Sequence, residues 1–385
     1  MTLSTQVYRT PAELDTLLTA VQEQFRTAPV DRPKGICGFD GFIDTFIRME
    51  TPATMAEFGP KVAEAAGISA SYTVRHEGDK FGGNGPLITS ALYGIYGGDI
   101  DLTYIGAMGK DAVLPIYQEA LQSKTKHLYT LTEPAHSDCL EFDDGKVMLC
   151  DLRSCSDITW DRLLEVIGKD ALDAELQSTD FIAAVNWGKL PHVGTIWKNL
   201  SQRLETLGRG KKEVVFFMDL AEFEPRPTAD RHALIQLIGA ITEQCRTLLS
   251  FNLKEAWQMG DLFGGQFHGR KDPDSVAELA GFLFQNIDVD RIIIHPNDGA
   301  ACASAEGISY VPGPVCQKPL ISTGAGDNFG GGCVAGTLLG LDDAGMLLAG
   351  VCASGYFVRT GDSPSLKEMA GLAEAWKNGT LPERL

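Results

Sequence analysis

The second half of the chain repeats one pattern: short segments rich in Val, Ile and Phe alternate with longer segments of helical periodicity. Apolar segments of this kind lie within residues 180–188, 213–220 and 290–300, and residues 193–208 and 231–245 have helical spacing. Apolar strands that alternate with helices are typical of a largely parallel sheet buried on both faces. The pattern therefore predicts an α/β fold with helices on both faces of the sheet.

The first half of the chain contains shorter and more polar strand-like segments, which predict a separate small sheet over the main domain. Two alternating runs within residues 136–153 are joined by Asp-Asp-Gly at 143–145, a typical β-hairpin turn. Residues 43–50 and 70–80 are further candidate strands of this sheet. Residues 1–33 are predicted to form an N-terminal helical extension, and residues 34–385 the main domain.

Composition restricts the partners and the compartment of the protein. The 385 residues include 33 Lys and Arg against 51 Asp and Glu, a net charge of −18. Because an acidic surface repels phosphate backbones and anionic membranes, we expect neither a nucleic acid nor a membrane partner. The nine cysteines include no Cys-x-x-Cys pair, which predicts reduced thiols in a cytoplasmic protein. No apolar run is long enough for a membrane span.

The strongest local signal is the glycine-rich segment 322–332, which leads into a predicted helix. Small residues allow a tight turn, and the free N–H groups at a helix start attract anions such as phosphate. Asp327 falls in the first turn of this helix. It is either a helix-capping carboxylate or a base that takes the proton of a substrate hydroxyl during phosphoryl transfer. The segment alone favours neither interpretation.

Four segments together resemble the ribokinase-like (PfkB) carbohydrate kinase family, over roughly residues 34–365. Thr-Gly-Ala-Gly-Asp at 323–327 is similar to the family signature, and Gly-Gly-Asn-Gly at 82–85 to its first glycine-rich motif. Residues 105–111 and the Asn-x-x-Glu at 252–255 match further motifs in the expected order. The resemblance implies a doubly wound, mostly parallel sheet with a small β-sheet lid. The lid would be formed by the segments at about 43–50, 70–80 and 136–153.

The resemblance also implies a reaction, the transfer of the ATP γ-phosphoryl group to a hydroxyl of a sugar or sugar-like molecule. Asp327 would be the catalytic base, beside an anion hole formed by Gly324, Ala325 and Gly326. Asn252 and Glu255 would hold Mg²⁺ through water, which agrees with the preference of Mg²⁺ for oxygen and water ligands. Thr323 and Gly299 would complete the ATP site.

The acceptor site is predicted at the start of the lid. Asp44 resembles the family's sugar-binding Asp, and carboxylates suit sugars because each accepts hydrogen bonds from two hydroxyls. Asp40, Gly83 and Asn84 are expected in the same pocket. The alternatives are solvated turn carboxylates for Asp40 and Asp44, and a tight helix entry for the glycines.

The sequence departs from the family pattern at three places. Leu87 stands where many members have a sugar-binding Asn, and Ile321 stands where an Asp often helps to hold a monovalent cation. Residues 295–299 read His-Pro-Asn-Asp-Gly in place of the usual Thr-x-Gly turn near the nucleotide. We therefore expect altered contacts in both pockets.

Alternative functions remain open at this point. A nucleoside kinase of the same fold is the nearest, because the spacing of Asp40 and Asp44 also resembles adenosine-kinase-like relatives. A non-catalytic ligand-binding protein on this scaffold is a second alternative. A dinucleotide-dependent oxidoreductase is weaker, because the first strand is followed by no G-x-G-x-x-G helix entry. The resemblance also suggests a homodimer formed through the lid.

Overall fold

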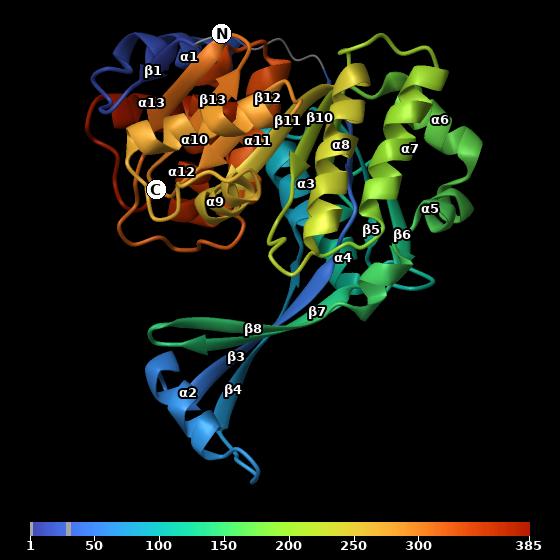
Figure 1. The fold of residues 1–385 in the computed structure, drawn as a ribbon, viewed down its shortest axis with the longest axis vertical. Helices are drawn as coiled ribbons and strands as arrows, with labels where there is room; N and C mark the ends of the chain where they lie inside the picture. Colours follow the sequence, from blue (N-terminus) through green and yellow to red (C-terminus); the bar gives the residue numbers. More distant parts are fainter. Residues whose placement is uncertain (1–2, 28–31) are drawn as a thin grey trace.

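A computed structural model describes residues 3–27 and 32–385. Its centre is a ten-stranded sheet with the order β1-β14-β13-β12-β11-β10-β9-β2-β5-β6 (Figure 1). The strands in this order are β1 (Thr5–Val7), β14 (Gly307–Pro312), β13 (Gly299–Ser304), β12 (Arg291–His295), β11 (Arg246–Asn252), β10 (Val215–Asp219), β9 (Phe181–Val185), β2 (Lys34–Gly38), β5 (Asp101–Ala107) and β6 (His127–Thr132). Among the strands that the structure describes in this sheet, only β13 runs antiparallel to its neighbours. The predicted mostly parallel sheet is therefore confirmed.

Helices cover both faces of this sheet. One layer contains α1 (Asp15–Thr27), α3 (Asn84–Ile95), α4 (Pro115–Leu121), α11 (Ala325–Leu338), α12 (Asp343–Thr360) and α13 (Leu366–Lys377). The other contains α5 (Trp160–Ile167), α6 (Lys169–Ser178), α7 (Val193–Thr206), α8 (Thr228–Gln244), α9 (Leu253–Leu262) and α10 (Pro273–Asn286), after a 3₁₀ turn η1 (Arg153–Asp157). In β10, Phe216 and Met218 enter one core and Val215 and Phe217 the other. Because successive side chains of a strand point to opposite faces, such a strand is apolar throughout.

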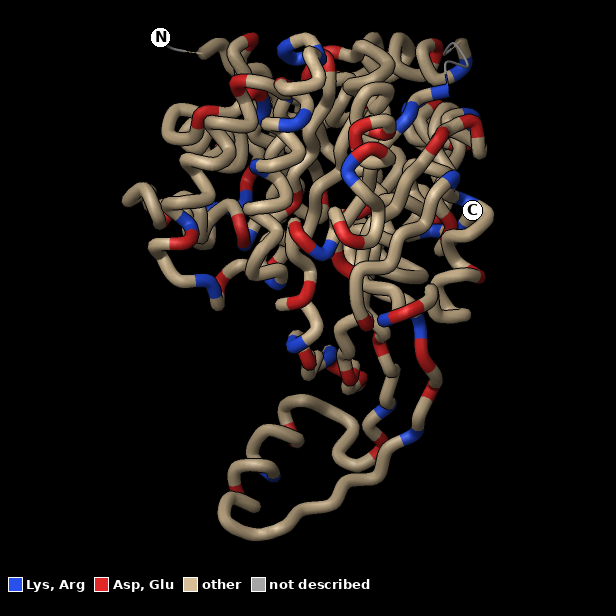
Figure 2. Tube along the Cα trace, turned by 90° about the vertical axis from the view of Figure 1, so that its right-hand side faces the viewer, with Lys and Arg blue, Asp and Glu red and all other residues tan. Residues whose placement is uncertain are grey.

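A second, four-stranded sheet projects from the main body in both views (Figure 1) and (Figure 2). It has the order β4-β3-β7-β8, formed by β4 (Thr73–Gly82), β3 (Phe42–Thr51), β7 (Ala135–Phe142) and β8 (Gly145–Asp151), with α2 (Met55–Glu64) between β3 and β4. We call these residues, 42–82 and 135–151, the lid. The small separate sheet of the predicted fold is thereby confirmed, and the predicted turn at 143–145 joins β7 to β8.

The N-terminal residues contribute to the main domain. Strand β1 pairs in parallel with β14 at the edge of the large sheet, and Leu14, Leu18 and Phe25 are buried in the core that α12 and α13 share. Residues 1–2 and 28–31 of the predicted extension lie outside the described residues. The division into an extension and a kinase domain stays a prediction. Among the residues that the structure describes, no helix is long and apolar enough to cross a membrane.

Candidate active site

The glycine-rich segment forms the entry to α11. Gly324 precedes the helix with φ +93°, a left-handed conformation that side chains other than glycine rarely adopt. Ala325, Gly326 and Asp327 form the first turn, so the free N–H groups of the helix lie beside Asp327. The later glycines serve packing, because a Cβ on Gly332 would lie 2.5 Å from the Ala349 carbonyl oxygen of α12.

Asp327 is half-buried and bonds to the start of another helix. The Asn84 side-chain amide, in the first turn of α3, donates a 3.0 Å hydrogen bond to Asp327 Oδ1. Burial and then the charge of Asp219 raise the pKa of Asp327 well above its ordinary range, while the Asn84 hydrogen bond opposes the shift. A carboxylate with a raised pKa binds a proton more strongly and is a better base.

Asp40 organises the turn between the lid and α3. Its carboxylate accepts hydrogen bonds from the backbone N–H groups of Asn84 (2.9 Å) and Gly85 (2.8 Å) and from the Asn186 side-chain amide (2.6 Å). Asp40 is fully buried, and its pKa is raised by burial and lowered by these hydrogen bonds. With hydrogen bonds to both oxygens, Asp40 is suited to hold the N-terminus of α3. Its expected contact with substrate stays a prediction.

Asp44 lies near this turn, on β3 of the lid. The backbone of the Gly82-Gly83 turn lies close to its carboxylate, because a Cβ on Gly82 would lie 2.3 Å from Asp44 Oδ2. The next residue, Gly83, has φ +103° and precedes α3. Burial raises the pKa of Asp44, and the charges of Lys189 and Lys146 oppose the shift. Residues 82–85 thus connect Asp44, Asp40 and Asp327 through one turn.

Asn252 and Glu255 form a capping box at the start of α9. The Glu255 N–H donates to Asn252 Oδ1 (3.0 Å), and the Asn252 N–H donates to Glu255 Oε2 (3.1 Å). The capping box satisfies free backbone N–H groups at the start of α9, so the Asn-x-x-Glu motif also stabilises this helix. It also leaves the second Glu255 oxygen outside these bonds.

The carboxylates near this motif have strongly shifted pKa values. Burial and then the charge of Asp219 raise the pKa of Glu255 to about 8. Burial also raises the pKa of Asp219 to about 6, and the charge of Asp40 adds to the shift. Carboxylates that repel one another without a balancing cation are a suitable environment for Mg²⁺. Among the described residues, no three His, Cys, Asp or Glu side chains are grouped closely enough to hold a metal directly.

The shifted pKa of Glu255 predicts how stability depends on pH. Between the ordinary Glu pKa of roughly 4.3 and about 8, the unfolded chain has lost a proton that the folded protein keeps. The free energy of unfolding therefore falls as pH rises through this range. We expect Glu255→Gln to flatten this fall, as measured by urea unfolding at pH 5, 6.5 and 8 at fixed ionic strength. Glu243→Gln, at an exposed position of α8, should keep the wild-type slope; parallel profiles for all three proteins would contradict the assignment.

A cavity of about 440 Å³ opens beside the start of α11. Four of the predicted ATP-site and anion-hole residues line it: Asn252, Gly299, Ala325 and Gly326. Its size is within the usual range of roughly 300–1,000 Å³ for small-molecule sites. Thr323 is exposed at the preceding turn, where its hydroxyl accepts a 3.0 Å hydrogen bond from Lys146 of the lid hairpin.

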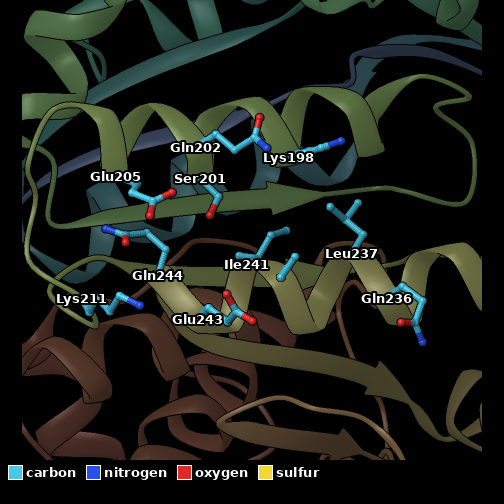
Figure 3. A pocket seen from close by; sticks show the side chains of 11 residues that line it. Lys198, Ser201, Gln202, Glu205, Lys211, Gln236, Leu237, Ile241, Glu243 and Gln244 are labelled. Atoms are coloured by element: carbon cyan, nitrogen blue, oxygen red, sulfur yellow. The ribbon is translucent and has the colours of Figure 1, made fainter.

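A second cavity, of about 400 Å³, lies between α7 and α8 (Figure 3). Its lining includes Lys198, Glu205, Lys211 and Glu243. None of the predicted site residues borders it, so the candidate site is the region around α3 and α11.

Sequence reasoning missed Asp219 as a residue of the site. Asp219 ends β10 and Asn186 follows β9, at the carboxyl edge of the parallel sheet where ligands of α/β proteins gather. The place of Asp219 at the end of a predicted strand was the sequence feature that could have identified it as a site residue. Asn186 has φ +63°, a conformation that no local sequence pattern predicted. Its side-chain amide donates a hydrogen bond to the Asp40 carboxylate.

Comparisons with known proteins identify the family and the fold. The sequence model of the family described as prokaryotic ketohexokinase matches residues 13–376. A ketohexokinase of Haloferax volcanii is 24% identical over 359 residues, which cover 90% of this chain and 92% of the relative. The Arabidopsis thaliana ribokinase complexed with ribose and ATP has a similar fold, with a TM-score of 0.62 and 15% identity over 89% of this chain and 99% of that one. Adenosine kinase of Sinorhizobium meliloti reaches a TM-score of 0.58 at 14% identity over 89% and 98% of the two chains.

Proposed function

The chain belongs to the prokaryotic ketohexokinase family and is an ATP-dependent sugar kinase, and from this premise we propose that its acceptor is a ketohexose. The name of the Haloferax volcanii relative supports a ketohexose. The observation that carries the site assignment is the hydrogen bond from Asn84 to Asp327. It links the predicted sugar pocket on α3 to the predicted base on α11.

In the proposed reaction, the sugar lies between Asp44 and Asp327. Asp327 takes the proton of the acceptor hydroxyl, whose oxygen bonds to the γ-phosphorus of ATP as the bond from that phosphorus to the β,γ-bridging oxygen breaks. The N–H groups at residues 324–326 stabilise the charge on the transferred phosphoryl group. Asp40 positions Asn84 and Gly85, and Asn84 holds Asp327 in place.

The lid completes this arrangement. Lys146 on β8 reaches Thr323, so a positive charge from the lid lies close to the anion hole. Closure of the lid would exclude water and limit the hydrolysis of ATP.

When bound, Mg²⁺ would neutralise phosphate charge near Asn252 and Glu255. We propose that these two side chains act through the water ligands of the ion.

The substrate proposal is tested by measuring ADP formation with a panel of acceptors. The panel contains ketohexoses such as fructose, aldohexoses, ribose, a ketohexose phosphate and adenosine. We expect kcat/KM to be highest for a free ketohexose. A higher kcat/KM for adenosine would overturn the proposal in favour of a nucleoside kinase, and no turnover of any ketohexose would also reject it.

We further propose that the protein is a homodimer that pairs through the lid. Six of the nine large apolar side chains that are exposed among the described residues belong to the lid: Met55, Val62, Ile68, Val74, Met148 and Leu149. No residue of α2 is buried. Exposed apolar patches of this kind mark interaction surfaces.

The dimer proposal predicts that charges on the lid surface produce monomers. Leu149→Glu and Ile68→Glu should halve the molar mass measured by sedimentation equilibrium. Leu320→Glu, at an equally exposed apolar residue of the main body, should remain dimeric. A wild-type monomer at micromolar concentration would refute the dimer.

We also propose a cytoplasmic location, because all nine cysteines are free.

A further inference from the structure

A histidine ring forms part of the wall of the 440 Å³ cavity. His295 is the last residue of β12 and pairs with Asn252, the last residue of β11. Its ring packs on Phe329 of α11 with 4.8 Å between the ring centroids. A Cβ on Gly326 would lie 3.5 Å from its Cε1 atom. The ring is therefore fixed between the Asn-x-x-Glu motif and the start of α11.

The Nε2 atom of this ring is buried and has no hydrogen-bond partner among the residues that the structure describes. Buried polar atoms in folded proteins almost always have a partner, and each exception calls for an explanation. Burial lowers the pKa of His295 to about 4, so the imidazole is neutral at physiological pH. A neutral imidazole carries one N–H donor and one acceptor nitrogen.

The residues around the ring indicate which part of a ligand would lie beside it. The side of the cavity around His295 contains Asn252, Ala325 and Gly326, with the free N–H groups of the α11 N-terminus. Another part is lined by Val315, Val351 and Val358, which suit an apolar base. Backbone N–H groups at a helix start favour phosphate, so His295 lies on the side expected for the phosphates of the nucleotide.

We propose that His295 donates a hydrogen bond from Nε2–H to a phosphate oxygen of bound ATP and so serves as a nucleotide-binding residue. This inference rests on the proposed function of the cavity. The residue belongs to the His-Pro-Asn-Asp-Gly segment in which this chain departs from the Thr-x-Gly pattern. An imidazole N–H would add a directed hydrogen bond to those of the anion hole.

Titration calorimetry with ATP, AMP and adenosine in the presence of Mg²⁺ tests this proposal. His295→Leu removes the donor and keeps an apolar contact with Phe329, whereas His295→Gln keeps an amide donor. One hydrogen bond to a charged group corresponds to roughly a tenfold change or more in Kd. We expect His295→Leu to raise the Kd of ATP by about tenfold and the Kd of adenosine by less than about twofold. His295→Gln should recover most of the ATP affinity.

The control is His192→Leu, the same substitution at an exposed histidine before α7, which should bind ATP as the wild type does. Equal Kd values for ATP in wild type and His295→Leu would overturn the inference and leave the kinase intact. An equal rise in the Kd of ATP and in the Kd of adenosine for His295→Leu would overturn the phosphate contact. A wild-type protein that neither binds ATP nor phosphorylates any sugar would instead reject the proposed function itself.

Discussion

Replacing Asp327 with asparagine should lower kcat by about 10³-fold while the Kd of ATP changes little. The new amide oxygen can still accept the hydrogen bond from Asn84 Nδ2, so the geometry at the start of α11 is kept. What is lost is the ability to take the proton of the acceptor hydroxyl. Steady-state kinetics with saturating sugar and calorimetry with ATP separate these two effects.

The stability of this variant provides an independent readout. Because burial and Asp219 raise the pKa of Asp327, its carboxylate destabilises the folded protein at neutral pH. Asp327→Asn should therefore unfold at an equal or higher temperature than the wild type at pH 7.5. Asp230→Asn, at a partly exposed position of α8 where the carboxylate pairs with Arg226, is the control and should retain full turnover. A kcat within tenfold of the wild type in Asp327→Asn would remove Asp327 as the base.

Replacing Asp44 with alanine should raise the sugar KM by about 100-fold. A carboxylate that accepts hydrogen bonds from two hydroxyls contributes about 1.5–3 kcal/mol through each of them. The Kd of ATP should stay unchanged, because Asp44 belongs to the lid and the predicted nucleotide residues lie at α9, β13 and α11. Sugar KM at saturating ATP, together with calorimetry, measures the difference.

The control for Asp44→Ala is Asp79→Ala, which removes an exposed lid carboxylate opposite Thr45 in the same sheet. That variant should keep the sugar KM within about threefold, since its charge faces solvent. If Asp44→Ala behaved like Asp79→Ala, Asp44 would be a solvated residue at the lid edge and the acceptor pocket would have to lie elsewhere. A loss of ATP affinity in Asp44→Ala would equally contradict the division between the two pockets.

Asp44 and Lys146 give the lid two distinct contributions. Asp44 lies on β3 next to the turn at Gly82, whereas Lys146 on β8 contacts Thr323 before the anion hole. One strand would thus hold the acceptor and another would bring a positive charge to the phosphoryl group. Substrate-dependent closure would assemble both at once, which is the general means by which kinases avoid transfer to water.

Local sequence patterns were sufficient for the fold and for the first turn of α11. The apolar runs within β9, β10 and β12 identified strands with two buried faces, because apolar and polar residues would alternate in a half-exposed strand. The small sheet followed from its polar strands and the Asp-Gly turn of its hairpin. The position of Asp327 beside free N–H groups followed from the glycine-rich turn together with the helix predicted directly after it. Strand β1 escaped notice because three residues carry no measurable periodicity.

Tertiary structure alone decided what the carboxylates do. Asp40 and Asp44 look alike in the sequence, but packing buries Asp40 under Asn186 and α3 and leaves Asp44 half-buried beside Gly82. Asn84 and Asp327 are separated by 243 positions and meet only because α3 and α11 pack side by side on one face of the sheet. The pKa of Glu255 depends on Asp219 from a neighbouring strand. Periodicity and turn chemistry act over a few residues, whereas burial and charge act through space, so the sequence determined the elements and the folded chain determined their chemistry.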